Sequence, residues 1–471
     1  MCRRNGKTNL SDLARSALLR HDVLGKGGGF VAQAAQDLQE HRLSGATPAA
    51  AEHFCAATEA FNFFLGDPIG ELDAALREAP DFAMAHLLKA HLFALTTETA
   101  ATEAARVSLE VAKACPMDSR EAGHVAALEA LLAGNWTQAA QLLDVHLMEW
   151  PRDIVALQSG HNIDFFRADA RDLRDRVARA LPEWTPEVPG HSVVLGMYAF
   201  GLEEAGDYAR AEALGREAVE TDPRDSWAHH AVAHVLEMEG RAAEGIVWMD
   251  DRAPYWAAEA SFFKVHNWWH KALCYLETDD PDAALAVYDA EIVDQGRLAL
   301  NLLDASALLW RLTLSGVEPG ARWTHLADLW EPHLPSTGYA FNDWHAAMAW
   351  IAAGRRDALA DTVAALRRDG LGEAGLWARE TGVALIEGFD AFWRADYDSA
   401  IAALMPARKI VGRFGGSHAQ RDVIDWTLTE AAIRGGLSGV AQALAHERRA
   451  LRPHSPVNSA FLRRAEAIAP A

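Results

Sequence analysis

The sequence has few cysteines and no long apolar run. Four cysteines are scattered over 471 residues without a CxxC spacing, which argues against a disulfide framework and against a cysteine-ligated zinc site. No run approaches the roughly 18 apolar residues that cross a bilayer, and none follows the basic residues of MCRRNGKTNL. We therefore expect a cytoplasmic protein with no membrane partner. We also expect a disordered tail over residues 1–10 and a single domain over residues 11–465.

Basic residues are also fewer than acidic residues. The chain has 44 basic and 66 acidic residues, a formal net charge of −22. This balance argues against nucleic acid or an anionic membrane as the main partner. Half of the residues are hydrophobic, so the chain can bury a sizeable core.

The catalytic signatures that have a fixed local spacing are missing as well. The sequence contains no GxSxG elbow, no GxGxxG fingerprint, no HExxH helix and no GxxxxGK[ST] loop. Alternation of apolar and polar residues, which is typical of strands, is scarce. These absences exclude the common hydrolase, dinucleotide and nucleotide motifs, and they leave a helical protein.

What the sequence does contain is a repeated turn between two amphipathic helical runs. Turns of this kind open at Gly134, Gly206 and Gly240. The last two are 34 residues apart, and a similar turn follows 40 residues after Gly240, at Asp280. Gly354, Ala395 and Gly436 continue the series at 41-residue steps. A period near 34 with two helices per unit is the tetratricopeptide spacing. The sequence therefore predicts an all-α fold, an α-solenoid of divergent tetratricopeptide-like helical hairpins that can curl around a central cavity.

Histidines occupy one register of these hairpins. His124, His230 and His270 each stand ten residues before a predicted turn, on the first helix of a unit. His234 and His266 lie four residues from His230 and His270, so each pair shares one face of its helix. Imidazoles at equivalent positions converge if the hairpins stack. The register therefore predicts a site on the inner surface of the array.

Further polar residues extend this candidate site. Asp343 and His345 straddle the same register before the turn at Gly354, and Asp304 interrupts the apolar run LNLLDASALLWRL. Ionisable groups in a water-poor cleft are often catalytic. We read His230, His234, His270, Asp343 and His345 as candidate acid–base residues, with ordinary imidazole pKa values near pH 6–7.

A Gly-Gly-Ser segment supplies a candidate anion site. Gly415 and Gly416 precede Ser417, a typical helix N-cap, and the helix then carries Gln420 and Arg421 in its first turns. Free backbone amides and a guanidinium together form a corner that binds a carboxylate or phosphate. We expect this corner to face the same cavity.

Six stretches of the sequence carry a family resemblance: Trp184-Thr185-Pro186, Tyr198-Ala199-Phe200-Gly201-Leu202, His230 to Met238, His266-Asn267-Trp268-Trp269-His270, Phe341-Asn342-Asp343-Trp344-His345 and Gly415 to Val423. Through them the chain resembles the tetratricopeptide repeat protein 38 family over nearly its whole length. The resemblance implies the helical-repeat fold, a cytoplasmic location and a protein-interaction role. One departure is Leu236, which stands where the family's AHxHEM stretch has a histidine, so a metal is less favoured if that histidine is a ligand.

Two function classes remain open. The first, which the clustered histidines favour, is a pocket for a small and anionic molecule, with hydrolase or other proton-transfer chemistry. The second is a scaffold that holds a peptide of a partner protein in the concave groove. A divalent metal is compatible with the His and carboxylate set but is not required by it. The residues assigned to ligand binding are His124, His161, Glu237, His266, Asp304, Gln420 and Arg421.

Overall fold

Tight turns with a left-handed residue join the helices into hairpins, as the repeated sequence pattern predicts. The computed structural model describes residues 35–368, 370 and 372–469. Gly134, Gly206, Gly240, Gly354 and Gly436 all have positive φ at the predicted turns, a conformation that glycine adopts without a steric penalty. The expected tail at residues 1–10 and the domain start at residue 11 lie outside the described residues.

Ala395 and Asp279 take the place of glycine in two of these turns. Their φ values are 59° and 61°. The turn expected at Asp280 therefore has its left-handed residue one position earlier. The repeat geometry is strong enough to hold residues with a β-carbon in a conformation that they adopt at a cost.

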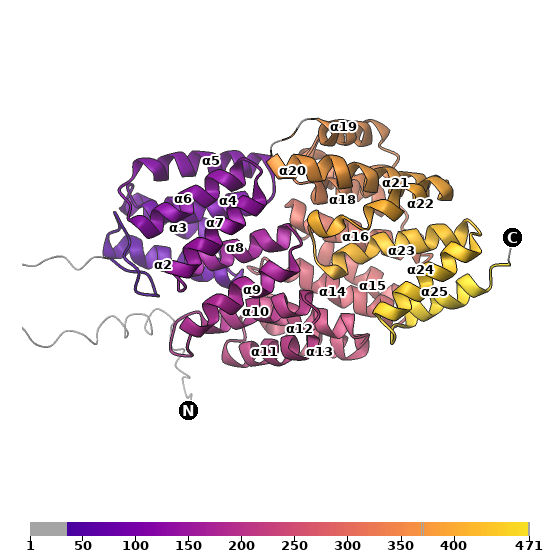
Figure 1. The fold of residues 1–471 in the computed structure, drawn as a ribbon, viewed down its shortest axis with the longest axis horizontal. Coiled ribbons are helices and arrows are strands. Elements are labelled where there is room, and N and C mark those ends of the chain that lie inside the picture. The colour runs from indigo at the N-terminus through magenta and orange to yellow at the C-terminus, as the bar shows by residue number, and fades with distance from the viewer. Residues whose placement is uncertain (1–34, 369, 371, 470–471) are drawn as a thin grey trace, which may run out of the picture. The chain divides into compact units, whose positions relative to one another are not determined.

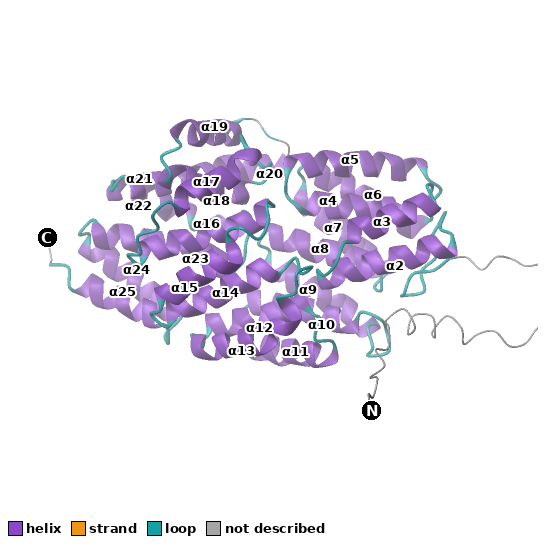
Figure 2. Ribbon diagram, turned by 180° about the vertical axis from the view of Figure 1, so that it is seen from behind, coloured by secondary structure: helices purple, strands orange, loops and turns teal. Residues whose placement is uncertain are grey.

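The first part of the array consists of seven consecutive hairpins (Figures 1 and 2). They are α2 (Pro48–Phe63) with α3 (Pro68–Glu78), α4 (Ala83–Leu95) with α5 (Thr99–Ala114), α6 (Ser119–Leu132) with α7 (Trp136–Glu149), α8 (Ile154–Phe166) with α9 (Ala170–Ala180), α10 (His191–Glu204) with α11 (Tyr208–Thr221), α12 (Ser226–Met238) with α13 (Ala242–Trp256), and α14 (Lys264–Glu277) with α15 (Pro281–Val287).

The second part is less regular, because short helical segments interrupt it. Its α-helices are α16 (Ala299–Leu314), α17 (Arg322–Trp330), α18 (Ala340–Ala352), α19 (Arg356–Arg367), α20 (Gly372–Trp377), α21 (Val383–Trp393), α22 (Tyr397–Ala407), α23 (His418–Arg434), α24 (Ser438–Leu451) and α25 (Pro456–Glu466). The short segments of the whole array are η1 (Leu181–Glu183), η2 (Tyr288–Ile292), η3 (Glu331–His333), η4 (Ala378–Gly382) and η5 (Val411–Arg413). The described residues form no strand, only two isolated bridges.

The first helices of successive hairpins pack side by side as an inner layer. Helices α10, α12, α14, α16 and α18 contact one another in this order. Helix α12 is buried at every residue from Ser226 to Met238, so its polar side chains need partners inside the protein. The inner layer therefore concentrates buried polar groups, and it carries the candidate site.

The C-terminal part of the array folds back onto this layer. Helix α23 contacts α12 and α16 and lies beside α16 in both views (Figures 1 and 2). Arg311 on α16 donates a hydrogen bond to the carbonyl of Ala419 (2.7 Å), and Trp310 donates one to the hydroxyl of Thr427 (3.0 Å). The inner surface of α12 and α16 is therefore partly covered by the chain itself.

The N-terminal hairpins reach the same region from another side. The amide of Phe262 donates to the carbonyl of Phe64 (2.8 Å), and the amide of Gly66 donates to the carbonyl of Ala260 (3.0 Å). The Ser226 hydroxyl donates to the carbonyl of Phe63 (2.8 Å). These contacts join segments about 160–200 residues apart, so the array curls back on itself.

Among the described helices, none combines the length and the apolar character that crossing a membrane needs. The cysteines that fall within the described residues, Cys55, Cys115 and Cys274, are free thiols. Neither finding changes the composition argument above.

Candidate functional site

Four histidines from two adjacent inner helices meet at one point. His230 and His234 lie one turn apart on α12, and His266 and His270 lie one turn apart on α14. Each offers one ring nitrogen, and these four nitrogens all lie within 4.8 Å of one another. The Nε2 atoms of His230 and His266 are 3.0 Å apart, and those of His266 and His270 are 3.2 Å apart. The structure therefore brings together the two pairs that the shared register links.

Carboxylates contact the opposite side of two of these rings. The Nδ1 atom of His266 lies 2.9 Å from Oδ2 of Asp304, and the Nδ1 atom of His270 lies 3.2 Å from Oε2 of Glu237. An ionised carboxylate only accepts hydrogen bonds, so it selects the imidazole tautomer with hydrogen on Nδ1. The Nε2 lone pairs then point at the centre of the cluster. Carboxylates held against the outer nitrogen are typical of metal-ligating histidines.

Two carboxylates at the end of α10 lie beside His234. Its Nδ1 atom lies 3.2 Å from Oε2 of Glu203 and 4.0 Å from Oε1 of Glu204. Burial raises the pKa of Glu203 well above its usual value, and the neighbouring charge of Glu204 adds to this shift. Although burial opposes it, the positive charges of His418 and Arg421 lower the pKa of Glu204 to about 2. Glu203 was not anticipated from the sequence; its only local sign was a pair of adjacent acids at the end of the apolar helix α10.

Burial decides the charge of the cluster. Removal from water lowers the pKa of His230 and His270 well below the usual value, and it lowers that of His234 to about 4. These rings are therefore neutral near pH 7, and the expectation of ordinary imidazole pKa values is wrong for them. Burial also raises the pKa of Glu237 to about 7, against the opposing charge of Arg452. Neutral imidazole is the form that binds metal ions.

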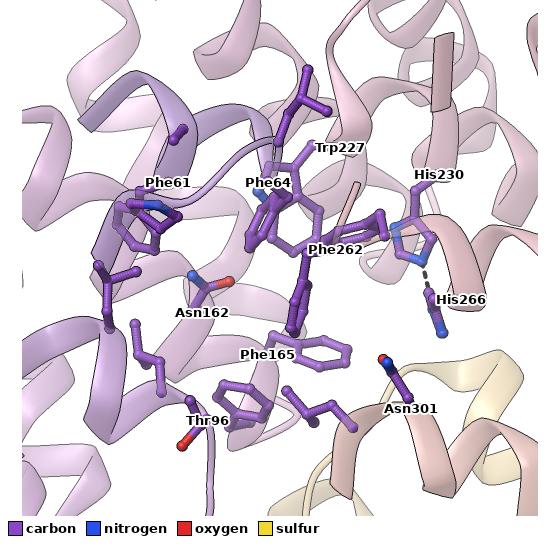
Figure 3. Close-up of a pocket in the computed structure, with 18 of the residues that line it drawn as sticks. Phe61, Phe64, Thr96, Asn162, Phe165, Trp227, His230, Phe262, His266 and Asn301 are labelled. Atoms are coloured by element: carbon purple, nitrogen blue, oxygen red, sulfur yellow. Dashed lines mark hydrogen bonds between the residues drawn. The ribbon is translucent and has the colours of Figure 1, made fainter. Parts of the chain in front are cut away.

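A largely apolar cavity of about 310 Å³ adjoins the cluster. His230 and His266 lie on one side of it, and aromatic side chains surround the rest (Figure 3). Asp304, Gln420, Asn162 and Asn301 add polar groups to the wall. The apolar wall was not anticipated from the sequence; doubled aromatics at helix ends, such as Phe63-Phe64 and Phe262-Phe263, were its only local sign. The aromatic members are Phe61, Phe64, Phe93, Phe165, Phe166, Trp227, Phe262 and Phe263.

His124 belongs to a second buried group and not to the first. Its Nδ1 atom lies 3.1 Å from Nε2 of His91, and its Nε2 atom lies 3.0 Å from Oδ2 of Asp153. The same carboxylate oxygen contacts His146 (3.1 Å) and Arg120 (2.7 Å). The expected convergence of His124 with His230 and His270 is therefore wrong. The neighbouring helices supply His124 with partners of its own.

The candidate acid–base pair on α18 is also engaged elsewhere. Asp343 accepts hydrogen bonds from the Ser336 hydroxyl (2.6 Å) and the Thr337 amide (2.7 Å), and so fixes the loop before its own helix. His345 donates through Nδ1 to the carbonyl of Phe341 (2.8 Å), one turn earlier. Neither residue has a hydrogen bond or ion pair to the four histidines. The prediction that Asp343 and His345 act together with His230, His234 and His270 is therefore wrong, because α18 directs these two side chains toward other partners.

His161 lies behind the wall of the cavity. Its ring packs at right angles to Trp227, with centroids 4.8 Å apart, and contacts Phe200 at 6.0 Å. Neither ring nitrogen has a hydrogen-bond partner. Burial lowers the pKa of His161 to about 3, so it is a neutral packing residue and does not line the cavity.

The expected anion corner at the start of α23 is filled by the chain itself. Arg421 donates to the carbonyls of Gly415 and Gly416 and lies 3.5 Å from Glu204, whose carboxylate also accepts the amide of His418 (2.9 Å). The anion at this helix terminus is therefore Glu204, which leaves Arg421 without a free face for a ligand anion.

Gln420 has a double role in the same turn. The side-chain oxygen of Gln420 accepts a hydrogen bond from the backbone amide of Ser417 (3.0 Å), and the backbone amide of Gln420 donates one to the Ser417 hydroxyl (3.2 Å). This reciprocal pair is a capping box. Gln420 also lines the cavity, and its role in ligand binding stays a prediction.

The chain shares little sequence with the solved structures to which it is similar. No family model matches the chain. Similar solved structures include the human IFIT1 dimer with m7Gppp-AAAA, at 14% identity over 88% of this chain and 95% of that chain, with a TM-score of 0.40. The APC/C hetero-tetramer Cut9-Hcn1 has 14% identity over 88% and 76%, with a TM-score of 0.40. Naa15/Naa10 bound to HypK-THB has 12% identity over 88% and 65%, with a TM-score of 0.25.

The hairpins themselves define the class of protein. The chain is a tetratricopeptide-like helical-repeat protein, an all-α solenoid of divergent hairpins. It differs from an open superhelix in that its own C-terminal helices cover part of the inner surface.

Proposed function

We propose that this protein is an enzyme for a small molecule whose apolar body fills the cavity and whose polar group meets the histidine cluster. The observation that carries the proposal is the junction of an aromatic-lined cavity with convergent imidazoles at one side (Figure 3). Enclosed apolar pockets with a few convergent polar groups are the usual form of a small-molecule site. Hydrolysis or another proton-transfer reaction suits this set of groups.

The proposal no longer includes an anionic group bound by Arg421. Glu204 already neutralises that guanidinium, and the carboxylate of Asp304 lines the cavity. A neutral or cationic head group fits these surroundings better than an anion does.

A variant that fills the cavity tests the proposal. Ala60 lines the cavity on α2, so Ala60→Phe should occupy the space and abolish turnover. Ala56, one turn earlier on the same helix, is exposed and does not line the cavity, which makes Ala56→Phe a matched control. We expect a metabolite extract to lose one compound with wild type and with Ala56→Phe, but not with Ala60→Phe. Equal activity of both variants, or no consumption of any compound by wild type, would contradict the proposal.

The alternative role, a scaffold for a peptide of a partner protein, is less favoured. A peptide in the concave groove would lie on the inner faces of α12 and α16, where α23 already packs. A partner that binds the outer helices remains compatible with the fold. Pull-down with wild type and with Ala60→Phe separates the two roles, because a scaffold keeps its partner in both.

We also propose that the chain belongs to the tetratricopeptide repeat protein 38 family and acts in the cytoplasm without nucleic acid. The His-bearing stretches at 230–238 and 266–270 and the net charge of −22 support this. Cell fractionation tests the location, and retention on immobilised RNA or DNA at physiological salt tests the last point.

A further inference from the structure

We propose that His230, His234, His266 and His270 hold one divalent transition-metal ion, with an open coordination position toward the cavity. The ions that imidazole ligands suit are Zn²⁺, Fe²⁺, Ni²⁺ and Cu²⁺. This site does not depend on the small-molecule proposal, since the ion binds to the four rings alone. If both hold, the ion would polarise the polar group of the substrate or activate a bound water.

The spacing of the nitrogens fits a shared ion. Four imidazoles and one open position make a five- or six-coordinate ion. Two imidazole nitrogens at about 2.0–2.1 Å from such an ion are about 2.9 Å apart when they are adjacent and about 4.1 Å apart when they are opposite each other. The Nε2 distances of 3.0 Å between His230 and His266 and 3.2 Å between His266 and His270 are close to the first value. All four ligand atoms lie within 4.8 Å. Only a small contraction of the cluster is therefore needed.

The lone pairs point the same way. Asp304 and Glu237 accept hydrogen from the Nδ1 atoms of His266 and His270, so both Nε2 atoms present lone pairs to each other. Such pairs repel at 3.2 Å unless a cation lies between them. Moreover, His234 is fully buried, and while its Nδ1 atom faces Glu203, its Nε2 atom has no hydrogen-bond partner. A polar side chain in that position is costly without a ligand.

Charge balance distinguishes this cluster from the second one. Around the four histidines, the buried carboxyl groups of Asp304 and Glu237 contact the outer nitrogens of His266 and His270 and supply the negative charge that a buried cation needs. In the group of His124, His146 and Asp153, the guanidinium of Arg120 already lies 2.7 Å from the carboxylate. We therefore place the ion at the first cluster and none at the second.

Direct metal analysis of the wild-type chain is the primary test. Protein dialysed against excess Zn²⁺ and then against metal-free buffer should retain one equivalent by elemental mass spectrometry. X-ray absorption of that sample should show an imidazole shell at about 2.0–2.1 Å. Retention of less than one tenth of an equivalent, or a shell dominated by sulfur or carboxylate, would overturn the proposal. This measurement needs no variant.

Variants then locate the ion. His266→Ala/His270→Ala should lose the Zn²⁺, whereas His124→Ala/His146→Ala, a matched pair in the second cluster, should retain it. Asp304 is a positioning residue, so Asp304→Asn should weaken Zn²⁺ binding about 10–100-fold while the melting temperature of the metal-free protein stays unchanged. This milder change decides the question if the double variants do not fold. Undiminished binding in both His266→Ala/His270→Ala and Asp304→Asn would refute the assignment.

The same assay separates this site from the proposed function. Ala60→Phe should keep the full equivalent of Zn²⁺ and lose only the small molecule. Loss of metal with retained turnover would reject the metal site alone, and retained metal without any substrate would reject the enzyme alone.

Discussion

Asp225 combines a favourable and an unfavourable role at the start of α12. Its Oδ1 atom accepts the amide of Ala228 (3.0 Å) and caps the helix, while Oδ2 is buried without a partner. Burial raises the pKa of Asp225 to about 8. Between the unfolded pKa near 4 and this value, the unfolded chain releases a proton that the folded chain keeps. The contribution of Asp225 to the free energy of unfolding is therefore fully present below about pH 4. It falls as the pH rises toward 8, by up to about 1.4 kcal/mol per pH unit.

Asp225→Asn should remove this pH dependence and keep a capping acceptor. We expect the free energy of unfolding of the variant, relative to wild type, to increase steadily from pH 5 to pH 8 in urea titrations. Asp280 caps α15 in the same way, through the amide of Ala283 (3.0 Å), but is exposed, so Asp280→Asn should follow the wild-type curve. Parallel curves for wild type and Asp225→Asn would show that the carboxyl is ionised in the folded state.

At this scale the sequence predicts the centre of the site but not its surroundings. His230, His234, His266 and His270 converge because a fixed helical register places equivalent positions of adjacent hairpins together. His124 has the same register but contacts His91 and Asp153 in a second cluster. The spacing of residues along the chain does not show which helices supply these partners. The apolar cavity wall depends in the same way on contacts between distant segments.

At the scale of the element, Ala395 marks a turn that is under strain. It is exposed, and its φ of 59° falls in the left-handed region, which costs a residue with a β-carbon about 1–2 kcal/mol. Ala395→Gly removes this cost but adds about 0.4–1 kcal/mol of chain entropy to the unfolded state. We expect a net gain of about 0.5–1 kcal/mol, measured by denaturant unfolding.

Gly206→Ala is the reverse change at an equivalent turn. Its φ is 82°, and an added β-carbon would meet no atom within 4 Å. The loss of stability should therefore come from backbone strain, offset in part by the lower entropy of the unfolded chain, and be similar in size to the gain at Ala395. A gain in both variants, or in neither, would mean that the left-handed conformation does not control the stability of these turns.

The turns were also the most predictable elements of the fold. Glycine or a short polar sequence at a period near 34–41 residues was enough to place seven hairpin turns. The return of α23 onto α12 and α16 was not predictable, because it depends on pairs such as Trp310 with Thr427 that are more than 100 residues apart. The repeat period shows which hairpins follow one another along the chain. It does not show which distant helices pack together.

At the scale of the whole described unit, the closing contacts should make unfolding more cooperative than in an open array. Repeat proteins whose units touch only their neighbours can open from the ends. Here the backbone bonds between Phe64 and Phe262 and between Gly66 and Ala260 tie early hairpins to the middle of the chain. We expect the amides of Gly66 and Phe262 to exchange hydrogen as slowly as those inside α12.

Hydrogen exchange read by mass spectrometry on peptides that cover these positions provides the measurement. The turn at 315–320, which joins α16 to α17 without such bonds to distant helices, supplies the fast reference. If Gly66 and Phe262 exchanged as fast as this turn, the closure would be a loose contact and the array would behave as independent repeats.

The composite origin of the cavity wall has a consequence for the nascent chain. Phe61, Phe64 and Phe93 leave the ribosome early, whereas their counterparts Asp304 and Gln420 are synthesised more than 200 residues later. At about 5–20 residues per second, this delay lasts on the order of ten seconds to a minute. During that time the aromatic surface has no cover, so the newly made protein depends on chaperones or on rapid translation of its second half.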